Sequence, residues 1–278
     1  MQSLVKRYFV KVADHPVFLR VMQWNILCDA LAFNSFDRVP DELVMWSYRE
    51  PLIIQHIIDQ DADIVCLEEV DKFNELMAKL GQTYAGKCIM KPDGVMGCAI
   101  LWKHGKVELD GEVQSRSLLD EQGKQQNQIV VYGRFKKDGK HFNVVCTHLK
   151  AKRGFEDLRK CQADQCAALL ADSKELTVVC GDFNDEPNSL CYQSMKGYDS
   201  LFARVLDGSE PEFTTFKYRE SSGMTKRTID YVFTRGVPTK VAGFLSMPAE
   251  SEIDQHMANP CKDHPSDHYS LVFDICAE

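Results

Sequence analysis

Polar side chains of a few types stand where short apolar runs of this sequence end or begin. The runs include RVMQW, IVCLE, VVCT and VVCG, and the polar residues beside such runs are Asn25, Glu69, His148, Asp182, Asn184, Asp230, Asp267 and His268. Strands of open α/β sheets deliver functional groups at their ends. If these ends share one edge, they form a cleft of two histidines, two amides and four carboxylates.

This oxygen-rich set suits a hard divalent cation, Mg²⁺ or Mn²⁺, better than zinc. Magnesium binds through one or two carboxylates and keeps water ligands that face a phosphate. Neutral histidine and asparagine can then contact phosphate oxygens while a remaining carboxylate polarises the attacking water. The residue types therefore predict hydrolysis of a phosphoester.

Each residue alone also fits an ordinary structural role. Asp182 after Gly181 suits a turn, His148 suits a strand end, and Asp230 suits a half-buried position bonded to backbone. Their joint occurrence beside six apolar runs favours the site over turn chemistry.

A zinc site from Cys261, His264 and His268 is the alternative metal centre. Pro265 breaks helical spacing there and no fourth ligand is evident, which disfavours it. The chain has 11 cysteines, an odd number, and no CxxC pair. We expect reduced, buried thiols, as in a reducing compartment.

Apolar, β-branched runs predict the strands that position these residues. The predicted strands are Phe18–Leu27, Ile64–Val70, Cys98–Trp102, Ile129–Phe135, Phe142–Leu149, Leu176–Cys180, Thr228–Thr234, Val241–Met247 and Tyr269–Ile275. Several are apolar at every position, which is typical of central strands buried on both faces. Lys137–Lys140 contains Asp-Gly and predicts a hairpin turn.

Three helices are predicted between these strands. Ser47 and Glu50 resemble a capping box, with Pro51 in the first turn. Asp71 is expected to cap a helix that Gly81 ends, and apolar spacing predicts a third helix over Gly154–Ala171. Strands alternating with helices predict a mixed α/β layered fold.

Composition fits one globular catalytic domain over residues 1–278, with residues 1–17 as a lead-in. No run of 18 apolar residues and no signal peptide is evident, so we expect no membrane association. A cytoplasmic location follows, with a mitochondrial form as the alternative. The net charge of -8 argues against an extended surface for duplex nucleic acid.

Six motifs in order resemble the endonuclease/exonuclease/phosphatase superfamily, most closely its nocturnin and carbon-catabolite-repressor deadenylase branch. They are Trp24–Asn25, Leu67–Asp71, Thr147–Ala151, Gly181–Asn184, Thr228–Tyr231 and Pro265–His268. The resemblance covers roughly residues 18–275. It implies a DNase I-like α/β sandwich of two sheets, with the active site at one edge of the sheets.

The resemblance also implies roles for the polar residues. Glu69 would be the main Mg²⁺ ligand, helped by Asn25 and Asp267. Asp182 would position or deprotonate the attacking water, and Asn184 would bind substrate or a second metal. Asp230 would orient His268, and the two histidines, His148 and His268, would stabilise charge on the phosphate.

Lys91, Lys150 and Lys152 are the basic residues expected at the substrate phosphates, and the sequence places no others near the site. The family usually has arginine at the position of Lys152, and lysine cannot make the same bidentate contact. Glu68 stands where relatives typically have glutamine. Because neighbouring strand residues face opposite sides, Glu68 should point away from the metal.

The resemblance implies an Mg²⁺-dependent phosphohydrolase acting on an adenine nucleotide or a short RNA 3′ end. Its candidate substrates are NADP(H), poly(A) RNA and 2′,5′-oligoadenylate. An inactive RNA-binding or scaffold relative is the alternative class. Phe213–Tyr218 fits either an aromatic platform for a base or an ordinary strand. We expect a monomer without an obligate protein partner.

Overall fold

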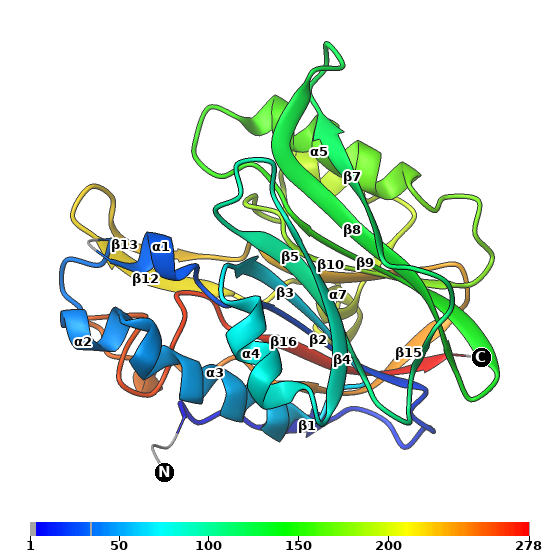
Figure 1. The fold of residues 1–278 in the computed structure, drawn as a ribbon, viewed down its shortest axis with the longest axis horizontal. Coiled ribbons are helices and arrows are strands. Elements are labelled where there is room, and N and C mark those ends of the chain that lie inside the picture. Colours follow the sequence, from blue (N-terminus) through cyan, green and yellow to red (C-terminus); the bar gives the residue numbers. More distant parts are fainter. Residues whose placement is uncertain (1–3, 34, 278) are drawn as a thin grey trace.

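The computed structural model describes residues 4–33 and 35–277, so the ends of the predicted domain, residues 1–3 and 278, lie outside it. Two seven-stranded sheets face each other, and helices cover their outer faces (Figure 1). This arrangement confirms the predicted α/β sandwich.

The first sheet runs in the order β1 (Phe9–Lys11), β15 (Thr239–Leu245), β16 (Leu271–Ala277), β2 (Leu19–Asn25), β3 (Ile64–Val70), β5 (Gly97–Lys103) and β4 (Tyr84–Met90). The second runs in the order β11 (Asp199–Ser200), β14 (Asp230–Arg235), β10 (Leu176–Asp182), β9 (Lys140–His148), β8 (Gln125–Lys137) and β6 (Glu108–Leu109), with β7 (Gln114–Leu119) also paired to β8. A separate two-stranded ribbon is made of β12 (Thr215–Arg219) and β13 (Gly223–Arg227).

The helices are α1 (Asp29–Ala32), α2 (Asp41–Val44), α3 (Trp46–Gln60), α4 (Phe73–Leu80), α5 (Glu156–Ala168), α6 (Leu190–Ser194) and α7 (Leu201–Val205), with a 3₁₀ turn at Glu250–Glu252. Helices α3 and α4 pack on the outer face of the first sheet, and α5 and α6 on that of the second. No helix in the described part of the chain is long and apolar enough to cross a membrane.

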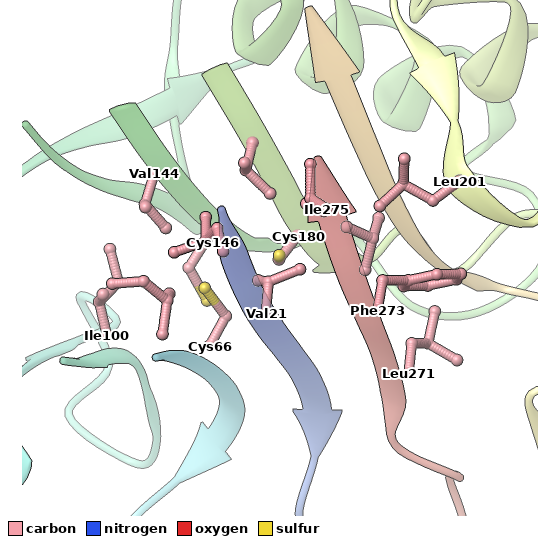
Figure 2. Packing of buried hydrophobic residues seen from close by; sticks show 14 of the residues in the cluster. Val21, Cys66, Ile100, Val144, Cys146, Cys180, Leu201, Leu271, Phe273 and Ile275 are labelled. Carbon is pink, nitrogen blue, oxygen red and sulfur yellow. The ribbon is translucent and has the colours of Figure 1, made fainter. Parts of the chain in front are cut away.

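The space between the sheets is filled by side chains from both (Figure 2). Val21 and Cys66 of the first sheet meet Val144, Cys146 and Cys180 of the second. The alternate residues of the same strands pack outward under the helices. The central strands are therefore buried on both faces, as the apolar runs predicted. All eleven cysteines are free thiols, and most are buried.

Two of the predicted helix starts are wrong. Helix α3 begins at Trp46 with Met45 as its N-cap, so Ser47 lies inside the first turn and Pro51 in the second. The backbone N–H of Met45 is already bonded to Asp41 of the preceding helix, so α3 starts directly where α2 ends. Asp71 does not cap α4, whose N-cap is Lys72. Asp71 instead accepts hydrogen bonds from Ala30 N and Cys28 Sγ.

The other predicted elements are present in the structure, but the ends of most of them differ by a few residues, and β8 runs from Gln125 to Lys137 where Ile129–Phe135 was predicted. The third predicted helix is α5, which ends at Ala168. The β8–β9 turn has left-handed backbone at Asp138 and Gly139, with φ of 49° and 79°, the geometry that Asp-Gly favours in a two-residue hairpin. Part of the expected lead-in belongs to the sheet, because β1 pairs with β15 and Arg7 donates to Ser246 O and Ser270 O.

A buried histidine links this packing to pH. Ser270 Oγ accepts a hydrogen bond from Arg7 Nη1 at 2.9 Å and lies 2.6 Å from His56 Nε2. The Ser270 hydroxyl keeps its own proton, which it can donate to His56 Nε2 when the imidazole ring is neutral. Burial, followed by the charge of Arg7, lowers the pKa of His56 well below 6.5. Below pH 6.5 His56 is protonated in the unfolded chain but remains neutral in the folded protein. The free energy of unfolding therefore decreases as the pH falls.

We predict that His56→Gln flattens the fall in unfolding free energy below pH 6.5. The slope should decrease by up to about 1.4 kcal/mol per pH unit, the value for one proton. Urea unfolding at a series of pH values measures it, with exposed His15→Gln as the control. An acid slope equal to that of the wild type would contradict the neutral state of His56.

Candidate active site

Strand register brings three of the predicted site residues into a row. Asp182 of β10 lies opposite His148 in the parallel β9–β10 pair and opposite Asp230 in the antiparallel β10–β14 pair. The three side chains stand on adjacent strands at one edge of the second sheet. All three residues are buried.

A β-bulge places the matching carboxylate on the first sheet. The pairing of β3 with β5 shifts register between Leu67 and Val70, and Glu69 has left-handed backbone with φ of 58°. A bulge re-aims a side chain. Glu69 therefore faces the site, where its Oε2 accepts a hydrogen bond from Cys28 N at 3.1 Å.

Asn25 joins the two sheets at this edge. Its Nδ2 donates to Glu69 Oε1 and to Asp182 Oδ2, both at 3.0 Å. Its Oδ1 accepts from Leu27 N at 3.0 Å. The amide thus fixes the separation of a carboxylate from each sheet.

His268 is held by Asp230 and faces Asp182. Its Nδ1 lies 2.9 Å from Asp230 Oδ2, while Thr214 Oγ1 donates to the same carboxylate oxygen at 2.6 Å. Trp24 Nε1 donates to His268 O at 2.8 Å. The outer ring nitrogen, Nε2, is then 3.8 Å from Asp182 Oδ2.

Neighbouring charges keep His268 protonated. Burial alone would lower its pKa, but Asp230, Asp267 and Asp182 raise it to about 9. Burial and then the charge of Asp230 raise the pKa of Asp182 to about 6, against the opposing effect of His268. At neutral pH the site therefore combines an imidazolium with a carboxylate of moderate basicity.

His148 has the opposite charge state. Lys91, which is 5% exposed, lies with Nζ 3.1 Å from His148 Nδ1. Burial and then Lys91 lower the pKa of His148 well below its usual range. Because an ammonium can only donate, Nδ1 accepts the bond, and the Nε2–H points towards Asp182 Oδ2 at 3.7 Å and Glu69 Oε1 at 4.0 Å.

Asp267 is paired with two cations that sequence reasoning missed. Lys217 Nζ lies 2.5 Å from its Oδ2 and Arg219 Nη2 lies 3.8 Å away. Burial opposes the charge, but Lys217 and His268 hold the pKa of Asp267 well below its usual range. The expectation that the three predicted lysines were the only basic groups near the site is wrong. The two-residue spacing of Lys217 and Arg219 on β12 was an available signal, because it puts both on one face.

The remaining substrate-binding candidates lie in loops at the same edge. Lys150 Nζ lies 4.6 Å from the centre of the Phe155 ring, and Lys152 is exposed. Asn184 donates from Nδ2 to Leu149 O at 3.2 Å, while its backbone N–H donates to Asp182 Oδ1 at 2.8 Å. The amide oxygen of Asn184 remains available for a substrate.

Glu68 is not among the possible metal ligands in the described part of the chain, but it lies next to the cluster, because the Gln23 amide that bonds it also donates to Asp230 Oδ1 at 3.2 Å. It is buried between the sheets, where its Oε2 accepts from Gln23 Nε2 at 2.8 Å and its Oε1 lies 3.4 Å from Cys146 Sγ. Burial, and then Cys98 and Asp230, raise the pKa of Glu68 well above its usual range. A neutral carboxylic acid has much the same shape as glutamine, which explains how glutamate is tolerated here.

Two groups of described residues are compact enough to hold a metal ion. Glu69, His148 and Asp182 form one, Asp182, Asp230 and His268 form the other, and the ligand atoms of each lie within 4.8 Å of one another. The zinc alternative is not supported, because among the described residues Cys261, His264 and His268 do not form a group of ligand atoms that could hold a metal ion.

The aromatic segment before β13 is mostly structural. Phe213 and Phe216 are buried in a small cluster with Tyr269, so their rings cannot stack on a base. Tyr218 is partly covered by the guanidinium of Arg38, which lies 3.4 Å from its ring centre. The ordinary-strand alternative holds for β12.

Known proteins are similar to this chain in sequence and in fold. Residues 22–268 match the model of the Endonuclease/Exonuclease/phosphatase family. Nocturnin of Drosophila melanogaster is 35% identical over 92% of this chain and 46% of its own length, and that of Homo sapiens is 33% identical over 95% and 66%. The solved structure of the human Nocturnin catalytic domain with bound sulfate anion has a TM-score of 0.78 at 28% identity and covers 98% of both chains. The chain thus spans about half to two thirds of the length of these curated relatives.

We predict that Glu69→Ala weakens Mn²⁺ binding by more than about ten-fold, a loss typical of disrupted metal sites. The melting temperature should change little, because removing one charge from an acidic cluster relieves repulsion. Titration calorimetry measures the affinity, with exposed Glu112→Ala as the matched control. Equal Mn²⁺ affinity in the two variants would show that Glu69 is not a ligand.

Proposed function

Because the chain belongs to the endonuclease/exonuclease/phosphatase family, we propose that it is an Mg²⁺-dependent phosphohydrolase that acts on an adenine nucleotide or an RNA 3′ end. The observation that carries the proposal is the position of Asp182. It is shared by the two groups of possible metal ligands and is bonded to Asn25 of the other sheet. One amide, two imidazole rings and two further carboxylates gathered around Asp182 are suited to phosphoester hydrolysis.

The donor set fits a divalent cation. Enzymes of this family are generally dependent on divalent metals, and hard oxygen donors favour magnesium or manganese. Glu69 would be the principal ligand, with Asn25 and Asp267 beside it. When bound, the cation would neutralise charge on the phosphate and lower the pKa of the attacking water.

Side chains of the protein would then accept the proton of the attacking water and donate hydrogen bonds to the phosphate. Asp182, whose pKa is about 6, is ionised at neutral pH and basic enough to take a proton from water. His268 would donate a hydrogen bond from Nε2 to a phosphate oxygen, while Asp230 holds its Nδ1–H. Neutral His148 would donate from Nε2, and Asn184 would offer its amide to the substrate.

A cavity beside the site supports a small substrate. Its volume is about 470 Å³, and it is lined by Ser35, Asp37, Arg219, Glu220 and Ser221. Arg219 reaches from this cavity to Asp267 in the cluster. Pockets for small molecules measure about 300 to 1,000 Å³, and this one is an open surface hollow lined by polar and charged side chains. We therefore favour NADP(H) or a short 3′ end, such as that of poly(A) RNA, with Lys91, Lys150 and Lys152 at the phosphates.

Two further parts of the proposal rest on simpler grounds. The free thiols fit a reducing compartment, which favours the cytoplasm. The main alternative substrate is 2′,5′-oligoadenylate, which also presents a phosphate next to an adenosine ribose.

The decisive experiment incubates the protein with NADPH, A-tailed RNA and 2′,5′-triadenylate in parallel, with Mg²⁺ or EDTA, and follows product release. We expect Mg²⁺-dependent turnover of NADPH or the RNA, with a KM that responds mildly to salt. Each neutralised phosphate of a single strand adds about 0.7 to the log–log slope, and we expect about two or three contacts.

Other outcomes of this panel would redirect the assignment. Turnover of triadenylate alone would indicate a 2′,5′-phosphodiesterase. A steep salt slope on RNA without NADPH turnover would indicate a processive deadenylase. Absence of turnover on all three substrates would contradict the proposal in favour of an RNA-binding or scaffold protein.

We also predict that Asp182 and His268 act as one unit. Asp182→Asn and His268→Gln should each reduce kcat strongly, and the double variant should cost little more than the worse single one. Single-turnover kinetics measures the effect, with exposed Asp172→Asn as the control for a lost surface carboxylate. Losses that multiply in the double variant would assign the two residues independent roles.

A further inference from the structure

One of the helices that cover each sheet carries a buried arginine. Arg49 of α3 is 0% exposed and Arg159 of α5 is 3% exposed. Each guanidinium points from its helix towards the site edge and donates mainly to backbone carbonyls. Apart from Val44 O of α2, which accepts from Arg49 Nε at 2.8 Å, these carbonyls belong to loops that carry or adjoin candidate site residues.

Arg49 connects the two loops of the first sheet. Its Nη1 donates to Ile26 O at 3.0 Å and to Leu27 O at 2.9 Å, directly after Asn25. The same nitrogen donates to Pro265 O at 3.4 Å, two residues before Asp267. A second link closes the same gap, because Ser266 Oγ donates to Asn25 O at 2.6 Å.

Arg159 connects the two loops of the second sheet. Its Nη1 donates to Lys152 O at 2.7 Å and to Lys150 O at 3.2 Å, and its Nε donates to Asp185 Oδ2 at 2.9 Å. Lys152 has left-handed backbone with φ of 80°, a conformation that side-chain-bearing residues rarely adopt. Asp185 follows Asn184 directly, so one guanidinium fixes both loops.

A guanidinium suits this task for physical reasons. It offers five N–H donors in a rigid plane, so it can bond several carbonyls at fixed angles. Buried loop carbonyls need such partners, because an unpaired buried polar group is costly. A lysine could satisfy one of these carbonyls but could not hold two loops in register.

We propose that Arg49 and Arg159 are positioning residues with separate targets. Arg49 holds Asn25 and Asp267 on the metal side of the site. Arg159 holds the loop that presents Lys150 and Lys152 to the substrate phosphates. The kinetic consequences rest on the proposed function, whereas the effects on metal binding and loop exposure do not.

Arg20 provides a matched control. It lies at the opposite end of β2 from Asn25, where it donates to both carboxylate oxygens of Asp274 and to Gln60 O. Its bonding resembles that of Arg159, but it touches no loop of the site. Substitution there measures the general cost of losing a structural arginine.

The first test uses Arg159→Met, Arg159→Lys and Arg20→Met with the substrate that the panel identifies. Arg159→Met should raise KM roughly ten-fold, the effect of about 1.4 kcal/mol, with kcat nearly unchanged. Arg159→Lys should raise KM less than Arg159→Met does, because the lysine ammonium can still bond one of the loop carbonyls. Arg20→Met should lower the melting temperature without changing KM. Equal KM values for the Arg159 and Arg20 variants would overturn the positioning role of Arg159.

The second test needs no turnover. Calorimetry should show Mn²⁺ binding roughly ten-fold weaker in Arg49→Lys than in the wild type or Arg20→Lys, a loss typical of groups that orient metal ligands. Trypsin should cut Arg159→Lys faster than the wild type at Lys152 and Arg153. The reason is that the lysine makes fewer hydrogen bonds to this loop than Arg159 does. Unchanged Mn²⁺ affinity or unchanged cleavage would overturn the corresponding role, even if no substrate is turned over. If the methionine variant does not fold, the lysine variants still decide both roles.

Discussion

The amide of Asn25 is the contact on which the rest of the site depends. It donates one hydrogen bond to Glu69 of its own sheet and one to Asp182 of the facing sheet. Two carboxylates this close would otherwise repel each other. The packing of Val21 and Cys66 against Val144 and Cys146 sets the distance between the sheets. At that distance the Asn25 amide can donate to a carboxylate of each sheet.

The two histidines of the site illustrate how neighbours set charge. His268 faces three carboxylates and is protonated at neutral pH, whereas His148 lies against Lys91 and is neutral. The two rings differ little in burial, so the difference comes from the sign of the nearest charge. One edge of the molecule thus holds a cationic donor and a neutral donor on either side of Asp182, which suits a phosphate with several oxygens to satisfy.

A one-residue backbone irregularity separates two adjacent glutamates. Glu68 keeps the regular strand alternation and faces the interior, where Gln23 and Cys146 surround it. The bulge turns the Glu69 side chain into the site, where it accepts a hydrogen bond from Asn25. The same chemical group therefore serves as a neutral core residue in one position and as a candidate metal ligand in the next.

The sequence by itself predicted nine of the strands and the polar residues at their ends, because burial on both faces leaves continuous apolar runs and each run stops where a polar group begins. It did not predict strands such as β4 and β7, whose residues are mostly half-buried or exposed and leave no continuous apolar run, and the two-sheet sandwich came from the resemblance to the family. The hairpin turn at Asp138–Gly139 was equally readable, because its left-handed backbone favours those residues. The helix starts at Ser47 and Asp71 were not, because Asp71 bonds across to Ala30 rather than to its own helix. Lys217 reaches Asp267 across 50 residues of sequence, Arg49 reaches Pro265 O across 216, and Arg159 reaches Asp185 across 26. Only tertiary structure decided those contacts, because they depend on how two sheets and their covering helices meet, and no local pattern encodes that.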